Sequence, residues 1–230
     1  MLKFTSEELE KFKKFQNIKE NSGEIEKKLI DKTIKYIKYV KWIPGLKMIA
    51  IGNSVAMNSA NNESDIDLFI VTAPNRLWIA RILITFIFQI LGVRKTNKFH
   101  KERFCLSFFC TTNALNFENI AIENDIYLYN WIFYLKPILN YDSTYEKFIN
   151  ENSKWIDITI QSNKYKIQNN KNEKNIFLDS LEQIIKSIFL PKTKKTFERL
   201  GRPFGVIINN EMLKFHNNDK RIEIRDKLIG

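Results

Sequence analysis

The sequence contains few cysteines: only two in 230 residues, Cys105 and Cys110. Both lie in one apolar run, residues 104–110, which predicts a strand. An odd separation along a strand puts two side chains on opposite faces, so a disulfide between these thiols is not expected. Their spacing also differs from that of cysteine metal ligands. Such cysteine usage is typical of a reducing, cytoplasmic compartment.

Long hydrophobic runs are also lacking. The first ten residues, MLKFTSEELE, contain no apolar core of a signal peptide. The most hydrophobic stretch, residues 77–93, has seventeen residues and includes Arg81 and Gln89, whereas a membrane span needs about 20 apolar residues. We expect a helix buried against a sheet, with a membrane-associated helix as the alternative.

Acidic residues are outnumbered by basic ones, with 26 Asp and Glu against 37 Lys and Arg, which gives a formal net charge of +11. This balance favours polyanionic partners such as nucleic acid, nucleoside triphosphates or an anionic membrane surface. The abundance of Lys, Asn and Ile also fits an AT-rich coding bias, which would contribute part of the charge without any function. Eighteen Phe and a hydrophobic fraction of 44% are sufficient for a core in one or two domains.

The stretch from residue 46 to residue 72 carries the most informative pattern. Residues 46–51 are apolar and predict a buried strand, which ends at a small polar turn formed by Gly52, Asn53 and Ser54. Backbone N–H groups and a hydroxyl at such a turn can bind a phosphate where a helix begins. One or two helical turns, residues 55–60, and a polar loop are expected to follow.

Two carboxylates come next. Asp65 and Asp67 open a second apolar strand, residues 68–71. Residues two apart point to the same face of a strand, so the two side chains project together from Cα atoms about 7 Å apart. Mg²⁺ binds through one or two carboxylates plus substrate phosphates. A phosphate-binding turn followed by such a strand is what phosphoryl or nucleotidyl transfer requires.

At these residues the chain resembles the nucleotidyltransferase superfamily, which includes DNA polymerase β, CCA-adding enzymes and small antibiotic nucleotidyltransferases. The family pattern is an apolar residue, Gly-Ser or Gly-Gly, about ten residues, and then Asp-x-Asp or Asp-x-Glu in an apolar strand. Residues 64–71, SDIDLFIV, match closely. The turn departs from the pattern: either Asn53 stands in place of Ser after Gly52, or Asn53-Ser54 replaces Gly-Ser. The resemblance covers about residues 25–115.

The resemblance implies a metal-dependent transfer of a nucleoside monophosphate from a triphosphate, with ATP expected, to an acceptor hydroxyl, for which an RNA end is one candidate. It implies that Asp65 and Asp67 are catalytic and bind Mg²⁺ or Mn²⁺. The residues expected to contact the nucleotide or its phosphates are Gly52, Asn53, Ser54, Ser64 and Arg76, with Arg81 as a further candidate.

Family members usually carry a third carboxylate on the next strand, where it completes the metal site and helps to deprotonate the acceptor. Residues 104–110 contain none. Cys105, Ser107 and Phe109 are expected on the site-facing side, with Ser107 at the missing position. Three alternatives remain: a site with two carboxylates, recruitment of Glu102 or Asp125, or a catalytically degenerate protein that binds nucleotide or nucleic acid.

The expected architecture is α/β (α+β), with a small mixed sheet flanked by helices in residues 1–120 and a mainly helical region in residues 121–230. The basic loop 94–103 is either a phosphate or RNA contact or a solvated connection, and His216 and Asp219 are interpreted as structural. A helical region interrupted at residues 22–23 is expected at 5–42. Further helices are expected at 125–139, at 142–155, at 176–190, where Pro191 ends the helix, and near the C-terminus. Residues 206–208 are a candidate strand, and residues 161–175 are a candidate linker.

Overall fold

The computed structural model describes residues 1–157 and 176–229, so the candidate linker 161–175 lies outside the described residues. Its centre is a six-stranded mixed sheet in the order β4-β1-β2-β3-β6-β5. The strands are β1 (Leu46–Ile51), β2 (Ile66–Thr72), β3 (Phe104–Thr111), β4 (Lys136–Asn140), β5 (Val206–Ile208) and β6 (Met212–Phe215). Only the β2–β3 pair is parallel among the pairs of this sheet.

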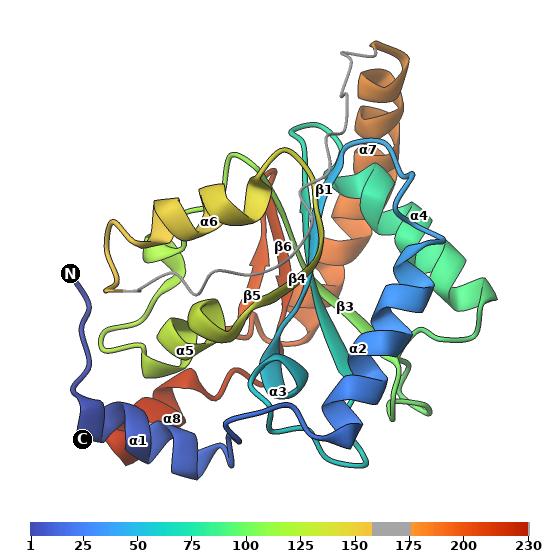
Figure 1. Ribbon diagram of the computed structural model, residues 1–230. Helices are drawn as coiled ribbons and strands as arrows, with labels where there is room; N and C mark the ends of the chain where they lie inside the picture. Colours follow the sequence, from blue (N-terminus) through green and yellow to red (C-terminus); the bar gives the residue numbers. More distant parts are fainter. Residues whose placement is uncertain (158–175, 230) are drawn as a thin grey trace.

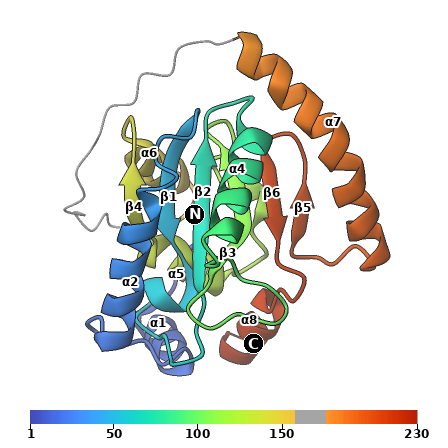
Figure 2. The ribbon, with the colours of Figure 1, turned by 90° about the vertical axis from the view of Figure 1, so that its right-hand side faces the viewer.

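Helices cover both faces of the sheet, which lies between them in Figure 1. On one face lie α2 (Glu24–Ile37), α4 (Leu77–Ile90) and α7 (Ile176–Arg199), and on the other α1 (Ser6–Phe15), α5 (Ile126–Tyr134), α6 (Thr144–Asn152) and α8 (Arg221–Leu228). The short α3 (Asn53–Ala56) follows β1 at one end of the sheet, as Figure 2 shows. The predicted mixed α/β class with a small sheet flanked by helices is confirmed.

Alternation along the strands produces two hydrophobic cores. Ile66, Leu68 and Ile70 of β2 belong to the core under α2 and α4, whereas Phe69 and Val71 belong to the core under α5 and α6. Both faces of β2 are therefore buried beyond Asp67, which explains why this strand reads as a continuous apolar run.

A bulge in β3 overturns one expectation about side-chain direction. Asp67 pairs with Cys105 but Phe69 pairs with Phe108, so β3 has one residue more than β2 in this interval. As a result Phe108 and Cys110 join the core on the face of Phe69, and Phe109 joins the opposite core. The expectation that Phe109 shares a face with Ser107, and that the two cysteines point to opposite faces, is wrong. Both cysteines are free.

The expected helix 125–139 is wrong in its second half. Helix α5 ends at Tyr134, and residues 136–140 form the edge strand β4. The residue before a proline disfavours the helical region, and a proline is tolerated in an edge strand because it need not donate a hydrogen bond there. Pro137 pairs with Ala50 next to an irregularity in the β1–β4 register. Strands β4, β5 and β6 thus extend the same sheet as β1–β3.

Two helix ends also differ from expectation. Helix α2 ends at Ile37, and turns occupy the following residues up to the start of β1. Helix α7 continues through Pro191 to Arg199. The hydroxyls of Thr193 and Thr196 donate to the carbonyls of Phe189 and Lys192, which adds hydrogen bonds around the turn from which the proline removes one.

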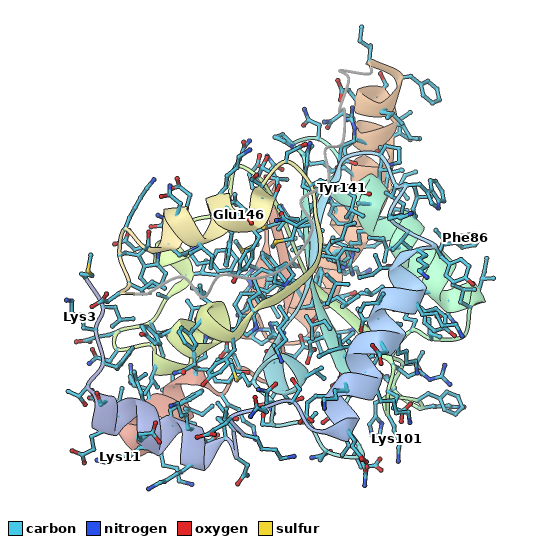
Figure 3. The ribbon with its side chains drawn as sticks, viewed as in Figure 1. Lys3, Lys11, Phe86, Lys101, Tyr141 and Glu146 are labelled. Atoms are coloured by element: carbon cyan, nitrogen blue, oxygen red, sulfur yellow. The ribbon has the colours of Figure 1, made fainter. Side chains whose placement is uncertain are left out.

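Among the described residues, no helix combines the length and apolar character needed to cross a bilayer. Helix α4, the most hydrophobic candidate, has 14 residues and packs its inner side against the sheet. Phe86 on its outer side is 61% exposed and points away from the molecule in Figure 3. Lys3, Lys11 and Lys101 are also directed outward in that view.

Candidate active site

The two expected carboxylates meet at one end of the sheet. Asp65 precedes β2 and Asp67 is its second residue. One carboxylate oxygen of each and the Sγ of Cys105 lie within 4.8 Å of one another. Cys105 joins them because it pairs with Asp67 in the parallel β2–β3 register. The sequence therefore predicted correctly that the two carboxylates project together.

The side chain of Asn53 holds Asp67 in place. Its amide donates to the Asp67 carboxylate, which the sulfur of Cys105 also approaches. Asn53 reaches Asp67 because the end of β1 lies beside β2, where the Gly52 N–H donates to the Asp67 carbonyl at 3.0 Å. Asn53 itself has a φ of 51°, a left-handed conformation that asparagine tolerates better than most residues. The oxygen of the same Asn53 amide accepts from Tyr127 Oη at 3.2 Å.

The electrostatics of the pair are unequal. Burial, together with the adjacent charge of Asp65, raises the pKa of Asp67 to about 6. Asp65 instead has a cationic partner, since Lys95 Nζ lies 2.5 Å from its Oδ2. Burial alone would lower the pKa of Lys95. The hydrogen bond to Asp65 and the nearby groups of Cys105 and Asp67 together outweigh burial, so the pKa of Lys95 is raised. Lys95 is therefore charged and offsets part of the carboxylate repulsion.

The third group of the cluster is a thiol rather than a carboxylate. Burial and the charge of Asp67 raise the pKa of Cys105 to about 12, so its sulfur stays protonated at neutral pH. A thiol is a weak donor and donates here to Ser107 Oγ at 3.4 Å. The two carboxylates fit a hard divalent cation such as Mg²⁺, whereas the protonated thiol does not add to that donor set.

A cavity of about 450 Å³ lies on the side of α5 and α8. Phe108, Tyr127 and Trp131 form aromatic parts of its wall, and Asn53 links it to Asp67. Its volume lies in the range of small-molecule sites, about 300–1,000 Å³. The wall is completed by residues from the segment after β6, including His216, Asp219 and Arg221.

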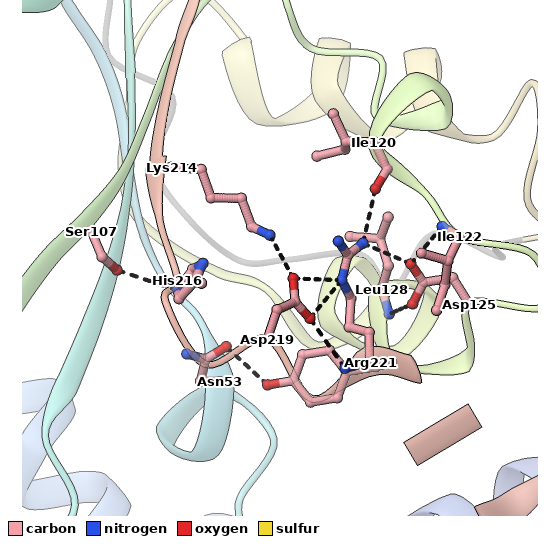
Figure 4. A network of polar contacts seen from close by, with 11 residues as sticks. Asn53, Ser107, Ile120, Ile122, Asp125, Leu128, Lys214, His216, Asp219 and Arg221 are labelled. Carbon is pink, nitrogen blue, oxygen red and sulfur yellow. Dashed lines mark hydrogen bonds and ion pairs between the residues drawn. The ribbon is translucent and has the colours of Figure 1, made fainter. Parts of the chain in front are cut away.

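Ser107, expected at the position of the missing carboxylate, has a histidine as its partner. Its Oγ lies 3.3 Å from His216 Nε2, and Figure 4 shows the two side chains facing each other, one on β3 and the other directly after β6. Burial and the positive charge of Lys214 lower the pKa of His216 to about 4, against a smaller opposing effect of Asp219. The imidazole is thus neutral at pH 7.

A buried ionic network holds the segment that carries His216 against α5. Arg221 Nε lies 3.0 Å from both carboxylate oxygens of Asp219, and Lys214 Nζ lies 3.1 Å from one of them. Arg221 also donates to Asp125 at 2.8 Å, and Asp125 caps α5 by accepting from the Leu128 N–H. Figure 4 shows this chain of contacts. The structural interpretation of Asp219 agrees with these contacts. Asp125, a candidate for the third carboxylate, is bound in this network through Arg221.

The other candidates in the loops near β2 have local partners. Ser64 Oγ accepts from the Asn61 N–H at 2.9 Å and stabilises the turn before Asp65. Glu102 lies close in the backbone, where its N–H donates to the Ser64 carbonyl, but its carboxylate is bound to Lys28 at 2.6 Å on α2. Ser54 lies in α3 next to Asn53, and its carbonyl accepts from the Ser59 N–H.

Gly52 has a packing reason for its identity. A Cβ at this position would lie 2.8 Å from Trp131 Nε1, so the indole of Trp131 occupies the space of a side chain. The close approach of the turn to α5 requires a glycine regardless of any phosphate.

The two arginine candidates do not join the carboxylates. Arg76 follows the far end of β2, which has seven residues and is therefore about 20 Å long. It forms an ion pair with Asp179 of α7 and is only 7% exposed. Arg81 lies on the α4 side of the sheet, where its guanidinium stacks 4.3 Å from the Phe215 ring. The expectation that Arg76 approaches a triphosphate bound at Asp65 and Asp67 does not agree with this placement.

Cys105 was expected on the site-facing side and His216 was interpreted as structural, whereas Lys95 and Tyr127 were not singled out from the sequence. Lys95 belongs to the basic loop 94–103, which was predicted only as a whole. Cys105 follows from pairing β2 with β3 in parallel, a signal that the order strand–helix–strand contains. His216 and Tyr127 come from elements whose positions depend on contacts more than 70 residues apart.

Compared with protein-family models, curated proteins and solved structures, this chain matches none of them. Its site is therefore interpreted from its own geometry.

Proposed function

We propose that this protein is a metal-dependent nucleotidyltransferase that moves a nucleoside monophosphate from a nucleoside triphosphate to an acceptor hydroxyl. The observation that carries the proposal is the pair Asp65 and Asp67, whose carboxylate oxygens lie within 4.8 Å of each other. Asp67 is bonded to Asn53, which lines a cavity of about 450 Å³. A helix–strand–turn–strand–helix–strand order over α2 to β3 agrees with the resemblance from which the proposal starts.

The donor set is suited to Mg²⁺ or Mn²⁺. Asp65 and Asp67 would hold the ion, leaving its remaining positions to water and phosphate oxygens. When bound, the ion would neutralise charge on the phosphates during transfer. The raised pKa of Asp67 fits this role, because a half-buried carboxylate beside Asp65 is costly unless more positive charge than that of Lys95 is present.

The chain's own residues have separate tasks in this proposal. Asn53 fixes the direction of the Asp67 carboxylate and is itself held by Tyr127. Lys95, bound to Asp65 in the free protein, is within reach of a triphosphate at the carboxylates and would attract it electrostatically. The formal net charge of +11 favours a polyanionic acceptor such as an RNA end.

Transfer is tested by incubating the protein with Mg²⁺, each α-³²P-labelled nucleoside triphosphate and total RNA. The proposal expects label on an acceptor with the wild type, and a loss of about 10³-fold or more with Asp65→Asn or Asp67→Asn, since both variants remove transition-state charge stabilisation. Glu63→Gln is the matched control, because Glu63 lies two residues away and is 68% exposed.

The alternative function is a nucleotide- or nucleic-acid-binding protein on the same scaffold. The observation that favours it is the protonated thiol of Cys105 and the hydroxyl of Ser107 at positions where a third carboxylate is expected. Calorimetry separates the two: triphosphate binding without transfer, with binding retained or tightened in Asp67→Asn, supports the alternative. Absence of both binding and transfer would overturn both functions.

A further inference from the structure

We propose that Ser107 and His216 together replace the missing third carboxylate and accept the proton of the acceptor hydroxyl. This inference rests on the proposed nucleotidyl transfer and names the proton path of that reaction. It also identifies the cavity beside α5 and α8 as the side from which the acceptor enters.

The first support is position. Ser107 lies on β3 two residues after Cys105, and its Oγ accepts the Cys105 thiol at 3.4 Å. Cys105 in turn belongs to the cluster with Asp65 and Asp67. The hydroxyl of Ser107 is thus one side chain away from the carboxylates, on the same side of the sheet.

The second support is the partner of that hydroxyl. A serine is too weak a base to act alone at neutral pH. The antiparallel pairing of β3 with β6 brings His216 next to Ser107, with Oγ and Nε2 3.3 Å apart. The charged groups acting on the imidazole are Lys214, Asp219 and Arg221 after or within β6, and Lys95 from the loop before β3. Burial and the charge of Lys214 lower the pKa of His216 to about 4, against the effect of Asp219. The ring is therefore neutral at pH 7, with a basicity close to that of the carboxylate it would replace, and its free ring nitrogen can accept a proton.

The surroundings distinguish this arrangement from a serine-nucleophile triad. In such a triad a carboxylate orients the histidine. Asp219, the acidic neighbour of His216, has both oxygens bound to Arg221 and one also to Lys214. The Ser107–His216 pair is therefore better suited to transferring a proton than to activating Ser107 as a nucleophile.

The third support is access. His216 lines the cavity of about 450 Å³, as do Phe108, Tyr127 and Trp131. An acceptor with a planar or apolar part would contact these rings and present its hydroxyl between Ser107 and the carboxylates. The same wall includes Asn53, which contacts Asp67.

The acceptor oxygen forms a bond to the α-phosphorus while the bond from that phosphorus to the bridging oxygen of pyrophosphate breaks. The acceptor proton passes to Ser107 Oγ as the Ser107 proton passes to His216 Nε2. The imidazole, protonated at Nδ1 beforehand, becomes an imidazolium and later releases its proton to water. Pyrophosphate leaves with the electron pair of the broken bond.

The decisive experiment is chemical rescue. His216→Ala is expected to lower the transfer rate at saturating triphosphate by about 100-fold or more, a usual contribution of proton transfer. Added imidazole should restore at least 10-fold of the loss, and substituted imidazoles should restore it in the order of their basicity. A merely structural role would show no such order. His100→Ala is the matched control, because His100 is the only other histidine and lies on the exposed loop 94–103.

Ser107→Ala and the double variant test the relay itself. Two groups that act as a unit give losses that are not additive. The transfer rate of the double variant should therefore be at most about threefold lower than that of either single variant. A His216→Ala enzyme within threefold of wild type, a loss without imidazole rescue, or additive losses would each overturn the inference.

Failure of the inference differs from failure of the proposed function. Wild-type transfer that depends on Asp65 and Asp67 but not on His216 leaves the function standing and removes the relay. A wild type without transfer removes both. Triphosphate binding by calorimetry and the circular dichroism spectrum of each variant show whether it folds, and His216→Gln, which keeps a polar side chain of similar size, replaces His216→Ala if the latter does not.

Discussion

Lys95, in the loop before β3, forms an ion pair with Asp65, which directly precedes β2, with 2.5 Å between Nζ and Oδ2. The carboxylate pair is therefore accompanied by a cation from the chain itself. Asp65 is 20% exposed and Lys95 40% exposed at the side chain, so solvent screens the pair only in part.

Lys95→Gln is expected to lower the free energy of unfolding by about 0.5–1 kcal/mol in a chelator-containing buffer, the magnitude of a partly exposed ion pair. It removes the cation that pairs with Asp65 while the two carboxylates stay. Added Mg²⁺ should then raise the melting temperature more in the variant than in the wild type. Lys98→Gln, an exposed change in the same loop, should have no such effect, and equal Mg²⁺ responses in all three proteins would contradict the expectation.

Asp67→Asn is expected to stabilise the metal-free protein at pH 8. The pKa of Asp67 is raised from 3.8 to about 6 in the folded protein, so its ionisation costs folding free energy above that pH. The advantage of the variant should be up to about 3 kcal/mol at pH 8, should decline as the pH falls below about 6, and should vanish only below the unfolded pKa of 3.8, where the unfolded chain is protonated as well. Urea unfolding at a series of pH values measures it, with the exposed Glu63→Gln as control. A constant difference across the series would refute this reading of Asp67.

Gly52→Ala is expected to destabilise the protein by about 1–3 kcal/mol, because the new methyl group would lie 2.8 Å from Trp131 Nε1. Trp131 is 6% exposed and packs 5.3 Å from the ring of Phe69, so the indole has little room to move. Denaturant unfolding of the double-mutant cycle with Trp131→Phe provides the check. The smaller ring should make the alanine less costly, and losses that simply add would show that the indole is not the obstacle.

Glu182→Gln is expected to loosen α7 from α4. The Glu182 carboxylate, 2% exposed, accepts from the backbone N–H groups of Trp78 and Ile79 at 2.8 Å each and so caps α4. A neutral amide satisfies only one of these donors well, so a loss of about 1–2 kcal/mol is expected. Limited proteolysis should cut α7 faster in this variant. Glu198→Gln on the exposed part of the same helix is the control, and equal cleavage of both variants would argue against the cap.

Local patterns predicted the part of the fold that carries the carboxylates. Apolar runs bounded by Gly52 and Asp65 indicated β1 and β2, and alternation placed Asp65 and Asp67 on one side. These features depend on residues a few positions apart. The bulge that turns Phe108 toward the core of Phe69 depends instead on the register between β3 and β2, and no residue within β3 predicts it.

Long-range contacts account for what the sequence did not reveal. Arg76 reads as a cation free to contact phosphate until Asp179, 103 residues later, is placed beside it. His216 reads as isolated until β6 pairs with β3. Such contacts arise from the packing of whole elements, so composition and periodicity do not contain them.

The position of β6 beside β3 has a consequence for the order in which the site is made. Ser107 and His216 are 109 residues apart along the chain, and a ribosome adds about 5–20 residues per second. Asp65 and Asp67 are therefore synthesised several seconds before the histidine that faces Ser107. A nascent chain would hold an incomplete site during that interval, and translation itself would delay the assembly of the Ser107–His216 pair until β6 has been made.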